Sequence, residues 1–183
     1  MLMFYLPQLN FLLALASLGL LAVTVFLAVD LFVLKGKYAR PYVAQYFWPV
    51  VLFVTIGSVA MSLLYSEYFG FIPCSLCWLQ RIAIYPQALM GLMAFKLRDE
   101  KYVSLYGIGL SAFGLLVAIY QYIYQMIPQE KLATGILPCL ADGSNADCAA
   151  KIIDEFGFVT FPFLSVVTFA FLIVLYLYRL RLR

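Results

Sequence analysis

Five stretches of apolar residues, each about as long as a membrane helix, constrain this chain more than any other feature. A helix needs about 20 apolar residues to cross a bilayer core of about 30 Å. The stretches therefore predict an all-α fold, a polytopic bundle of membrane helices with five spans. They run from Asn10 to Leu34, Tyr42 to Tyr65, Ser75 to Phe95, Tyr102 to Ile127 and Thr160 to Tyr178.

The first stretch is predicted to be a retained membrane helix and not a cleaved signal. Met1 to Gln8 contains no lysine or arginine, and the apolar run that follows is much longer than the roughly 7 to 15 residues of the apolar region of a signal peptide. Asp30 falls in its last turns, near the headgroups, where we expect a structural role. A four-span chain without this helix would leave every later segment in place.

Lysine and arginine residues predict the orientation, because they accumulate on the cytoplasmic side of short loops. Nine of the twelve fall on one side of a five-span chain, which places the amino terminus outside and the carboxyl terminus in the cytoplasm. The net charge of +3 is spread among these loops and forms no basic stripe, so no nucleic-acid partner is expected. The nine are Lys35, Lys37, Arg40, Lys96, Arg98, Lys101, Arg179, Arg181 and Arg183.

The four cysteines form two pairs on the predicted outer side. Cys74 and Cys77 form a C-x-x-C motif, and Cys139 and Cys148 lie in the long outer connection 128–159. Two pairs facing one compartment indicate thiol–disulfide exchange between them. After Cys148, the spacing of apolar and charged residues in 149–156 predicts a short amphipathic helix on the membrane surface.

The C-x-x-C motif is predicted to open a membrane helix. Pro73 suits a first helical position, so the helix N-terminus is expected to lower the pKa of the Cys74 thiol. Cys77 and Arg81 are four residues apart and therefore share a helix face. Candidate partners for Arg81 are the Cys77 thiolate or a polar group of a bound molecule, and the alternative is that it extends to the headgroups.

Other readings of the cysteines stay open at this point. A tetrathiolate zinc site usually needs closer spacing than that of Cys139 and Cys148. Two inert structural disulfides in a non-enzymatic membrane scaffold or transporter subunit are a further alternative. The chain has no histidine, which excludes histidine-ligated haem and histidine-dependent acid–base catalysis.

The run from Pro73 to Arg81, continued by Ile84-Tyr85-Pro86, resembles the DsbB family of disulfide bond formation proteins. The resemblance covers residues 42–183 and implies a four-helix redox domain with the outer loop 128–159. Residues 1–41 would add an N-terminal transmembrane helix and a cytoplasmic loop. The family implies a multi-pass protein of the plasma (inner) membrane with its cysteines on the periplasmic or extracytoplasmic side.

The same resemblance implies an activity, namely a quinone-dependent thiol oxidase that reoxidises a DsbA-like partner of the thioredoxin fold. Cys139 would form the mixed disulfide with the partner, and Cys148 would then attack Cys74. Cys77 would become the thiolate beside the quinone, ubiquinone or menaquinone, and Arg81 would support its reaction.

Two related architectures fit less well. Vitamin K epoxide reductase relatives carry the loop pair before the C-x-x-C motif, whereas here it follows. A conduit that carries electrons across the membrane would need cysteines reachable from the cytoplasm, and none lies near the predicted cytoplasmic loops.

Overall fold

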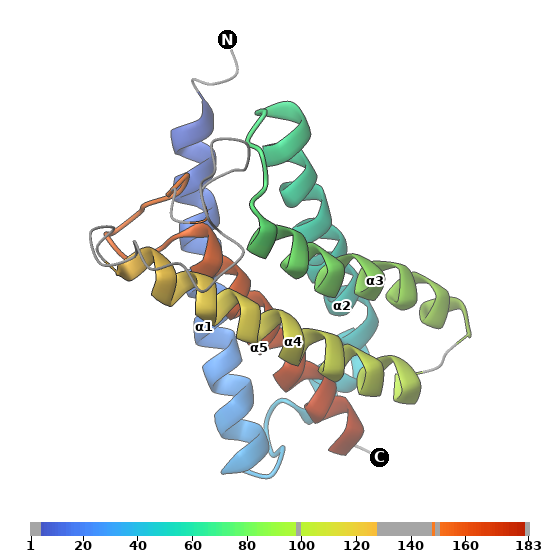
Figure 1. Ribbon diagram of the computed structural model, residues 1–183. Coiled ribbons are helices and arrows are strands. Elements are labelled where there is room, and N and C mark those ends of the chain that lie inside the picture. The colour runs from blue at the N-terminus through green and yellow to red at the C-terminus, as the bar shows by residue number, and fades with distance from the viewer. Residues whose placement is uncertain (1–4, 98–99, 128–147, 149–150, 182–183) are drawn as a thin grey trace.

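The structure is a computed structural model that describes residues 5–97, 100–127, 148 and 151–181. The described residues form five α-helices in an all-α bundle, as predicted, with the start of α1 and the end of α5 at opposite ends of the molecule (Figure 1). A π-helical turn, η2, continues the second helix. The elements are α1 Leu6–Phe32, α2 Arg40–Leu63, η2 Leu64–Tyr68, α3 Ser75–Leu97, α4 Glu100–Met126 and α5 Phe161–Arg181.

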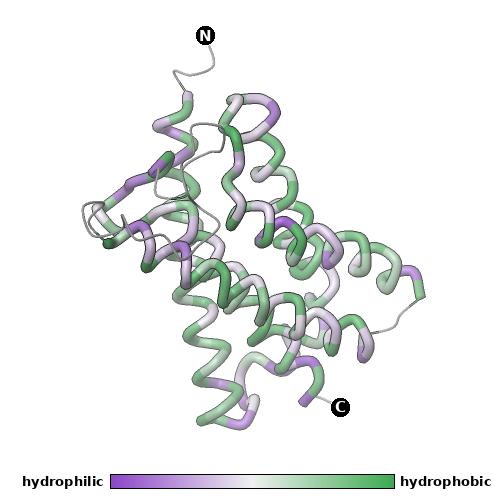
Figure 2. The backbone as a smooth tube through the Cα atoms, in the orientation of Figure 1, coloured by the Kyte–Doolittle hydropathy of each residue, from purple (hydrophilic) through white to green (hydrophobic). Residues whose placement is uncertain are grey.

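Four of these helices are long and apolar enough to cross a membrane: α1, α2 with η2, α4 and α5. The fifth, α3, has 23 residues but is less apolar, because Gln80, Arg81 and Gln87 interrupt it. All three side chains are buried. Figure 2 shows hydrophobic residues along the length of the helices and hydrophilic ones near the start of α3 and in the connections. The polar residues of α3 therefore belong to the interior of the bundle.

Helix ends follow local chain chemistry. Pro41 lies in the first turn of α2, where its missing N–H costs no hydrogen bond. Two left-handed residues follow the end of α1, Lys35 with φ 56° and Gly36 with φ 78°. The Gly36 N–H donates to the Asp30 carbonyl at 2.8 Å, which closes the last turn. This bend turns the chain back into α2.

α5 lies at the centre of the bundle, with α4 and α1 packed against it, while α3 connects α4 to α2 (Figure 1). Two glycines of α4 permit the close approach of α5. A Cβ at Gly107 would lie 2.5 Å from the Tyr176 ring, and one at Gly114 would overlap the Phe169 ring. Both aromatic side chains are buried, so the glycines set the distance between the two helices.

The prediction of an amphipathic helix over 149–156 is wrong for residues 151–156, the part of this segment that the structure describes. Residues 151–154 have no helical structure, and Glu155 pairs with Val159 in an isolated antiparallel bridge around a tight turn. Phe156 and Gly157 both have positive φ, which an α-helix does not allow. Ile153 is fully buried, so packing against the bundle replaces the expected surface contact.

Candidate redox site

Cys74 and Cys77 lie together at the beginning of α3. Their sulfurs are 2.9 Å apart, and both cysteines are free thiols. The Trp78 N–H donates to the Cys74 carbonyl at 3.0 Å, so Cys74 is the residue that precedes the helix and Cys77 is in its first turn. Cys74 is 5% exposed, whereas Cys77 is half-buried. The two sulfurs thus differ in access.

Gln121 of α4 holds both sulfurs from the opposite helix. Its Nε2 donates to Cys74 Sγ at 3.3 Å and to Cys77 Sγ at 3.5 Å. Its Oε1 accepts a hydrogen bond of 2.7 Å from Gln80 Nε2, which orients the amide with its donor group towards the cysteines. Hydrogen bonds donated to a sulfur favour its anionic form. The pair is therefore built to hold one negative charge.

The two thiols do not share that charge equally. The hydrogen bond with Cys77, together with burial, raises the pKa of the Cys74 thiol. The expectation that the helix N-terminus would lower this pKa is therefore wrong for Cys74, because its neighbour and the apolar surroundings outweigh the helix end. The Cys77 sulfur, which accepts hydrogen bonds and is more accessible, is the better position for a thiolate.

Arg81 finds its hydrogen-bond partner on α2, while its positive charge also interacts with Cys77. Its Nε donates to the Ser62 hydroxyl and its Nη2 to the Ser62 carbonyl, both at 2.9 Å. The guanidinium also lies over the Trp78 ring, 5.1 Å from its centre. Arg81 is 8% exposed and so does not extend to the headgroups. It sits one helical turn below Cys77, inside the bundle.

Cys148 is brought to the same site. It is 1% exposed, is disulfide-bonded, and belongs to one buried cluster with Cys74 and Leu76. Gln125 of α4 donates from Nε2 to the Cys148 carbonyl at 3.2 Å. Cys139, the fourth predicted site residue, lies outside the described residues. Three of the four predicted cysteines thus meet around the start of α3.

The added helix α1 reaches this region as well. The Tyr65 hydroxyl donates to Asn10 Oδ1, and Asn10 Nδ2 donates to the Ile152 carbonyl at 3.4 Å. Asn10 therefore links η2 to the segment that follows Cys148. The rings of Phe11 and Phe156, 5.9 Å apart, extend the same contact.

Three residues of the site were not found from the sequence: Gln121, Gln80 and Ser62. A usable signal was present, since polar side chains within apolar helices are costly unless they find partners in the interior. Which helix supplies which partner depends on packing between segments 19 to 47 residues apart.

Comparison with known proteins places the chain among disulfide formation proteins. Residues 44–179 match the family model described as disulfide bond formation protein DsbB. Disulfide bond formation protein C of Bacillus subtilis is 36% identical over 69% of this chain and 84% of its own length. A probable disulfide formation protein of Oceanobacillus iheyensis is 37% identical over 68% of this chain and 81% of its own.

A third relative has the same description. A probable disulfide formation protein of Coxiella burnetii is 34% identical over 81% of this chain and 96% of its own length. No solved structure matches the chain.

Proposed function

Because this chain belongs to the DsbB family and is a membrane protein of disulfide bond formation, we propose that it is a quinone-dependent thiol oxidase. Its thiol donor would be a DsbA-like protein of the thioredoxin fold. The observation that carries the proposal is the position of Cys148, which is disulfide-bonded and packed in one buried cluster with Cys74, next to two free thiols.

The proposed route moves two electrons through two exchanges. The partner's thiolate attacks Cys139, forms a mixed disulfide and releases Cys148 as a thiolate; the partner's second thiol then displaces Cys139. The reduced loop pair passes the electrons on when the Cys148 thiolate attacks Cys74 of a Cys74–Cys77 disulfide and releases Cys77. Attack by Cys139 on Cys148 then restores the loop disulfide and leaves Cys74 and Cys77 reduced.

Conversion of the reduced Cys74 and Cys77 back to their disulfide releases two electrons and two protons, and a quinone would take them up when bound. The residues around Cys77 suit a quinone. Trp78 and Ile82 expose large apolar side chains at the same helix end, and Ser62 occupies only two of the Arg81 nitrogens. Arg81 would hold a quinone oxygen with its remaining N–H groups, and Gln121 would stabilise the Cys77 thiolate before it reacts.

The proposal includes a location and a division of the chain. The cysteines and the loop 128–159 would face the extracytoplasmic side of the plasma membrane, with the amino terminus on that side and the carboxyl terminus in the cytoplasm. Residues 42–183 would form the redox domain, and residues 1–41 an added helix and loop. Labelling Cys148 with an impermeant thiol reagent, in reduced intact cells, would test the location; protection until lysis would contradict it.

A purified system tests the activity itself. Full-length protein in detergent, supplied with a ubiquinone or menaquinone analogue and a reduced DsbA-like protein, should oxidise the partner and reduce the quinone in equal amounts. Cys139→Ser should abolish both. Ser144→Ala, in the same loop, is the matched control and should keep both. Partner oxidation by Cys139→Ser at the wild-type rate would contradict the relay.

A non-enzymatic scaffold or transporter subunit with structural disulfides is the alternative function. It predicts that neither the partner nor the quinone reacts with the wild-type protein. It also predicts that free Cys74 and Cys77 stay reduced after addition of quinone, which thiol counting would detect.

A further inference from the structure

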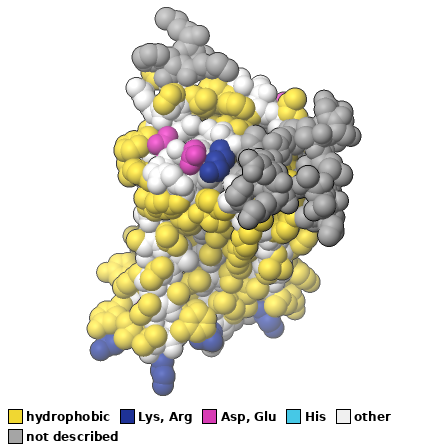
Figure 3. All heavy atoms as spheres, turned by 60° about the vertical axis from the view of Figure 1, so that its left-hand side comes forward, with side chains coloured by type: hydrophobic (Ala, Val, Ile, Leu, Met, Phe, Trp, Pro, Cys, Tyr) yellow, Lys and Arg dark blue, Asp and Glu magenta, His cyan; other side chains and the backbone are white. Residues whose placement is uncertain are grey.

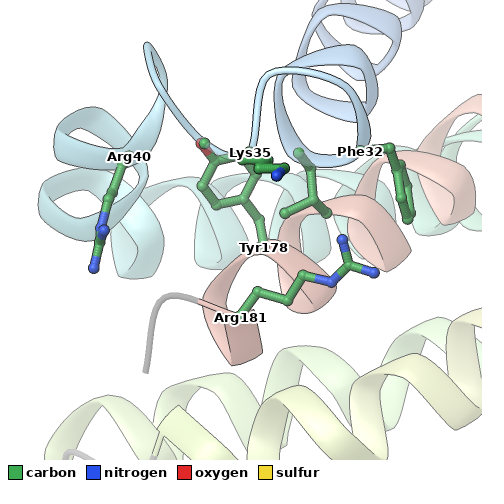
Figure 4. A pocket seen from close by; sticks show the side chains of 7 residues that line it. Phe32, Lys35, Arg40, Tyr178 and Arg181 are labelled. Carbon is green, nitrogen blue, oxygen red and sulfur yellow. The ribbon is translucent and has the colours of Figure 1, made fainter.

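A basic pocket lies at the end of the molecule opposite the cysteines. It has a volume of about 380 Å³ and opens where the C-terminal part of α5 meets the loop between α1 and α2. Figure 4 shows Tyr178 between Arg40 and Lys35, and Arg181 reaching towards Phe32. Its lining residues are Leu31, Phe32, Lys35, Gly36, Arg40, Tyr178 and Arg181.

The lining of the pocket is positively charged. Lys35, Arg40 and Arg181 are exposed, and no acidic residue is among the seven that line it. Asp30 lies behind Tyr178, whose hydroxyl donates to it at 2.6 Å. Three cations less this one carboxylate still leave two positive charges in excess. An anion is the ligand that such a pocket favours.

Lys35, which lines the pocket, has a strained backbone conformation that its surroundings maintain. Lys35 has φ 56°, a left-handed conformation that residues other than glycine rarely adopt. A hydrogen bond from the Gly36 N–H to the Asp30 carbonyl holds the turn. The Tyr178 hydroxyl packs closely against Gly36, since a Cβ added there would lie 3.1 Å from it. Such strain persists where the surrounding structure fixes it, often at ligand sites.

The pocket also adjoins an apolar surface. Phe32, Val33 and Leu34 expose large apolar side chains beside it, and the Arg181 guanidinium lies 4.8 Å from the centre of the Phe32 ring. In Figure 3 the apolar surface of the molecule ends in a row of Lys and Arg side chains at this end. A ligand here meets charge on one side and hydrocarbon on the other.

We propose that this pocket binds the phosphate group of an anionic phospholipid, with the acyl chains along the exposed apolar end of α1. Basic pockets between membrane helices favour such headgroups. Six of the seven lining residues fall outside the family match at residues 44–179; Tyr178 is the exception. The site is thus built by the end of the added helix α1, the connection into α2 and the C-terminal part of α5, and it does not depend on the redox function.

Native mass spectrometry of the full-length protein in detergent tests the site. The protein is titrated with phosphatidylglycerol and, separately, with phosphatidylcholine of the same acyl chains. Wild-type protein should retain one phosphatidylglycerol in preference to phosphatidylcholine. Lys35→Gln and Arg181→Gln should each lower that affinity about fivefold, as expected for one charge near an anionic headgroup.

Lys37→Gln is the matched control, because Lys37 lies in the same loop but does not line the pocket. It should bind phosphatidylglycerol as the wild type does. Equal affinity for the two lipids, or an equal loss in Lys37→Gln, would overturn the proposal. So would displacement of the lipid by millimolar inorganic phosphate, since the ligand would then be a free anion.

Discussion

Two hydrogen bonds join Arg81 of α3 to Ser62 of α2, one to its hydroxyl and one to its carbonyl, both at 2.9 Å. Buried charge is tolerated in an apolar bundle only when such partners are present. The bonds fix the guanidinium between two helices, within one turn of Cys77. Ser62 is therefore the residue that sets the position of the Arg81 guanidinium.

Ser62→Ala should slow the reaction with quinone more than the exchange between cysteine pairs. The substitution removes the hydrogen bond from Arg81 Nε to the Ser62 hydroxyl and leaves the one from Nη2 to the Ser62 carbonyl. Arg81 therefore stays near α2, but the orientation of its guanidinium is no longer fixed. Loss of one hydrogen bond to a charged group is worth about 1.5–3 kcal/mol, or about tenfold or more in rate if it falls on this step. Stopped-flow absorbance of the quinone gives the first rate, and acid-quenched thiol alkylation gives the second.

Ser58→Ala is the control for this variant. Ser58 lies one turn earlier on α2 and donates to the Val54 carbonyl of its own helix at 2.7 Å. It should leave quinone reduction unchanged. An equal slowing in both variants would mean that α2 is generally perturbed and that the Ser62 contact has no special part.

Cys77 should be alkylated faster than Cys74 when iodoacetamide is added at neutral pH. The pKa of the Cys74 thiol is raised by Cys77 and by burial, so Cys74 remains a protonated thiol. Cys77 is more accessible and accepts a hydrogen bond from Gln121. Gln121→Leu should reduce the rate at Cys77 severalfold, since the thiolate loses a donor. Peptide mass spectrometry after timed quenching measures both sites.

Gln45→Leu provides the comparison, because Gln45 is exposed on α2. Its alkylation rates should equal those of the wild type. Faster modification of Cys74 than of Cys77, or an unchanged Cys77 rate in Gln121→Leu, would contradict the assignment of the charge to Cys77.

Gly107→Ala should destabilise the bundle, whereas Gly109→Ala should not. A Cβ at Gly107 would meet the buried Tyr176 ring at 2.5 Å, but nothing lies within 4 Å of one at Gly109. Forcing atoms into a packed interface costs about 1–3 kcal/mol. Thermal unfolding in detergent should show a lower midpoint for Gly107→Ala alone. Equal midpoints would show that α4 and α5 can separate without cost.

Asp30→Asn should also lower stability. The Asp30 carboxylate is fully buried and accepts hydrogen bonds from the N–H groups of Tyr38 and Ala39 and from the Tyr178 hydroxyl. An amide replaces one acceptor oxygen by a donor, which leaves a buried N–H facing another donor, at about 1–3 kcal/mol. Thermal unfolding measures the effect, and Asp154→Asn, at an exposed position, serves as the control.

The helices could be predicted from the sequence to within a few residues, because long apolar runs have few alternatives in a bilayer. The predicted Ser75 to Phe95 became Ser75–Leu97, and Thr160 to Tyr178 became Phe161–Arg181. The five-helix arrangement and the start of α3 at the C-x-x-C motif followed from the same runs. The first helical position predicted for Pro73 is wrong, because α3 begins two residues later, at Ser75.

The segment after Cys148 could not be predicted in this way. Its apolar spacing fitted an amphipathic helix, but Ile153 is buried against the bundle, and Asn10 binds the Ile152 carbonyl from a helix 142 residues away. Gln121 was missed for a similar reason. Its partners on α3 are 41 to 47 residues distant, and only the packing of α3 on α4 brings them together.

Two tyrosine hydroxyl groups donate hydrogen bonds to residues of α1, and this limits how the protein can be shortened. The Tyr65 hydroxyl depends on Asn10 and the Tyr178 hydroxyl on Asp30, at opposite ends of the same helix, and both tyrosines are buried. A chain begun at Tyr42 would leave both hydroxyl groups without these partners. Trimming this chain to four helices therefore changes the surroundings of two buried core tyrosines, and a shortened version is a redesign of the core as well as a deletion.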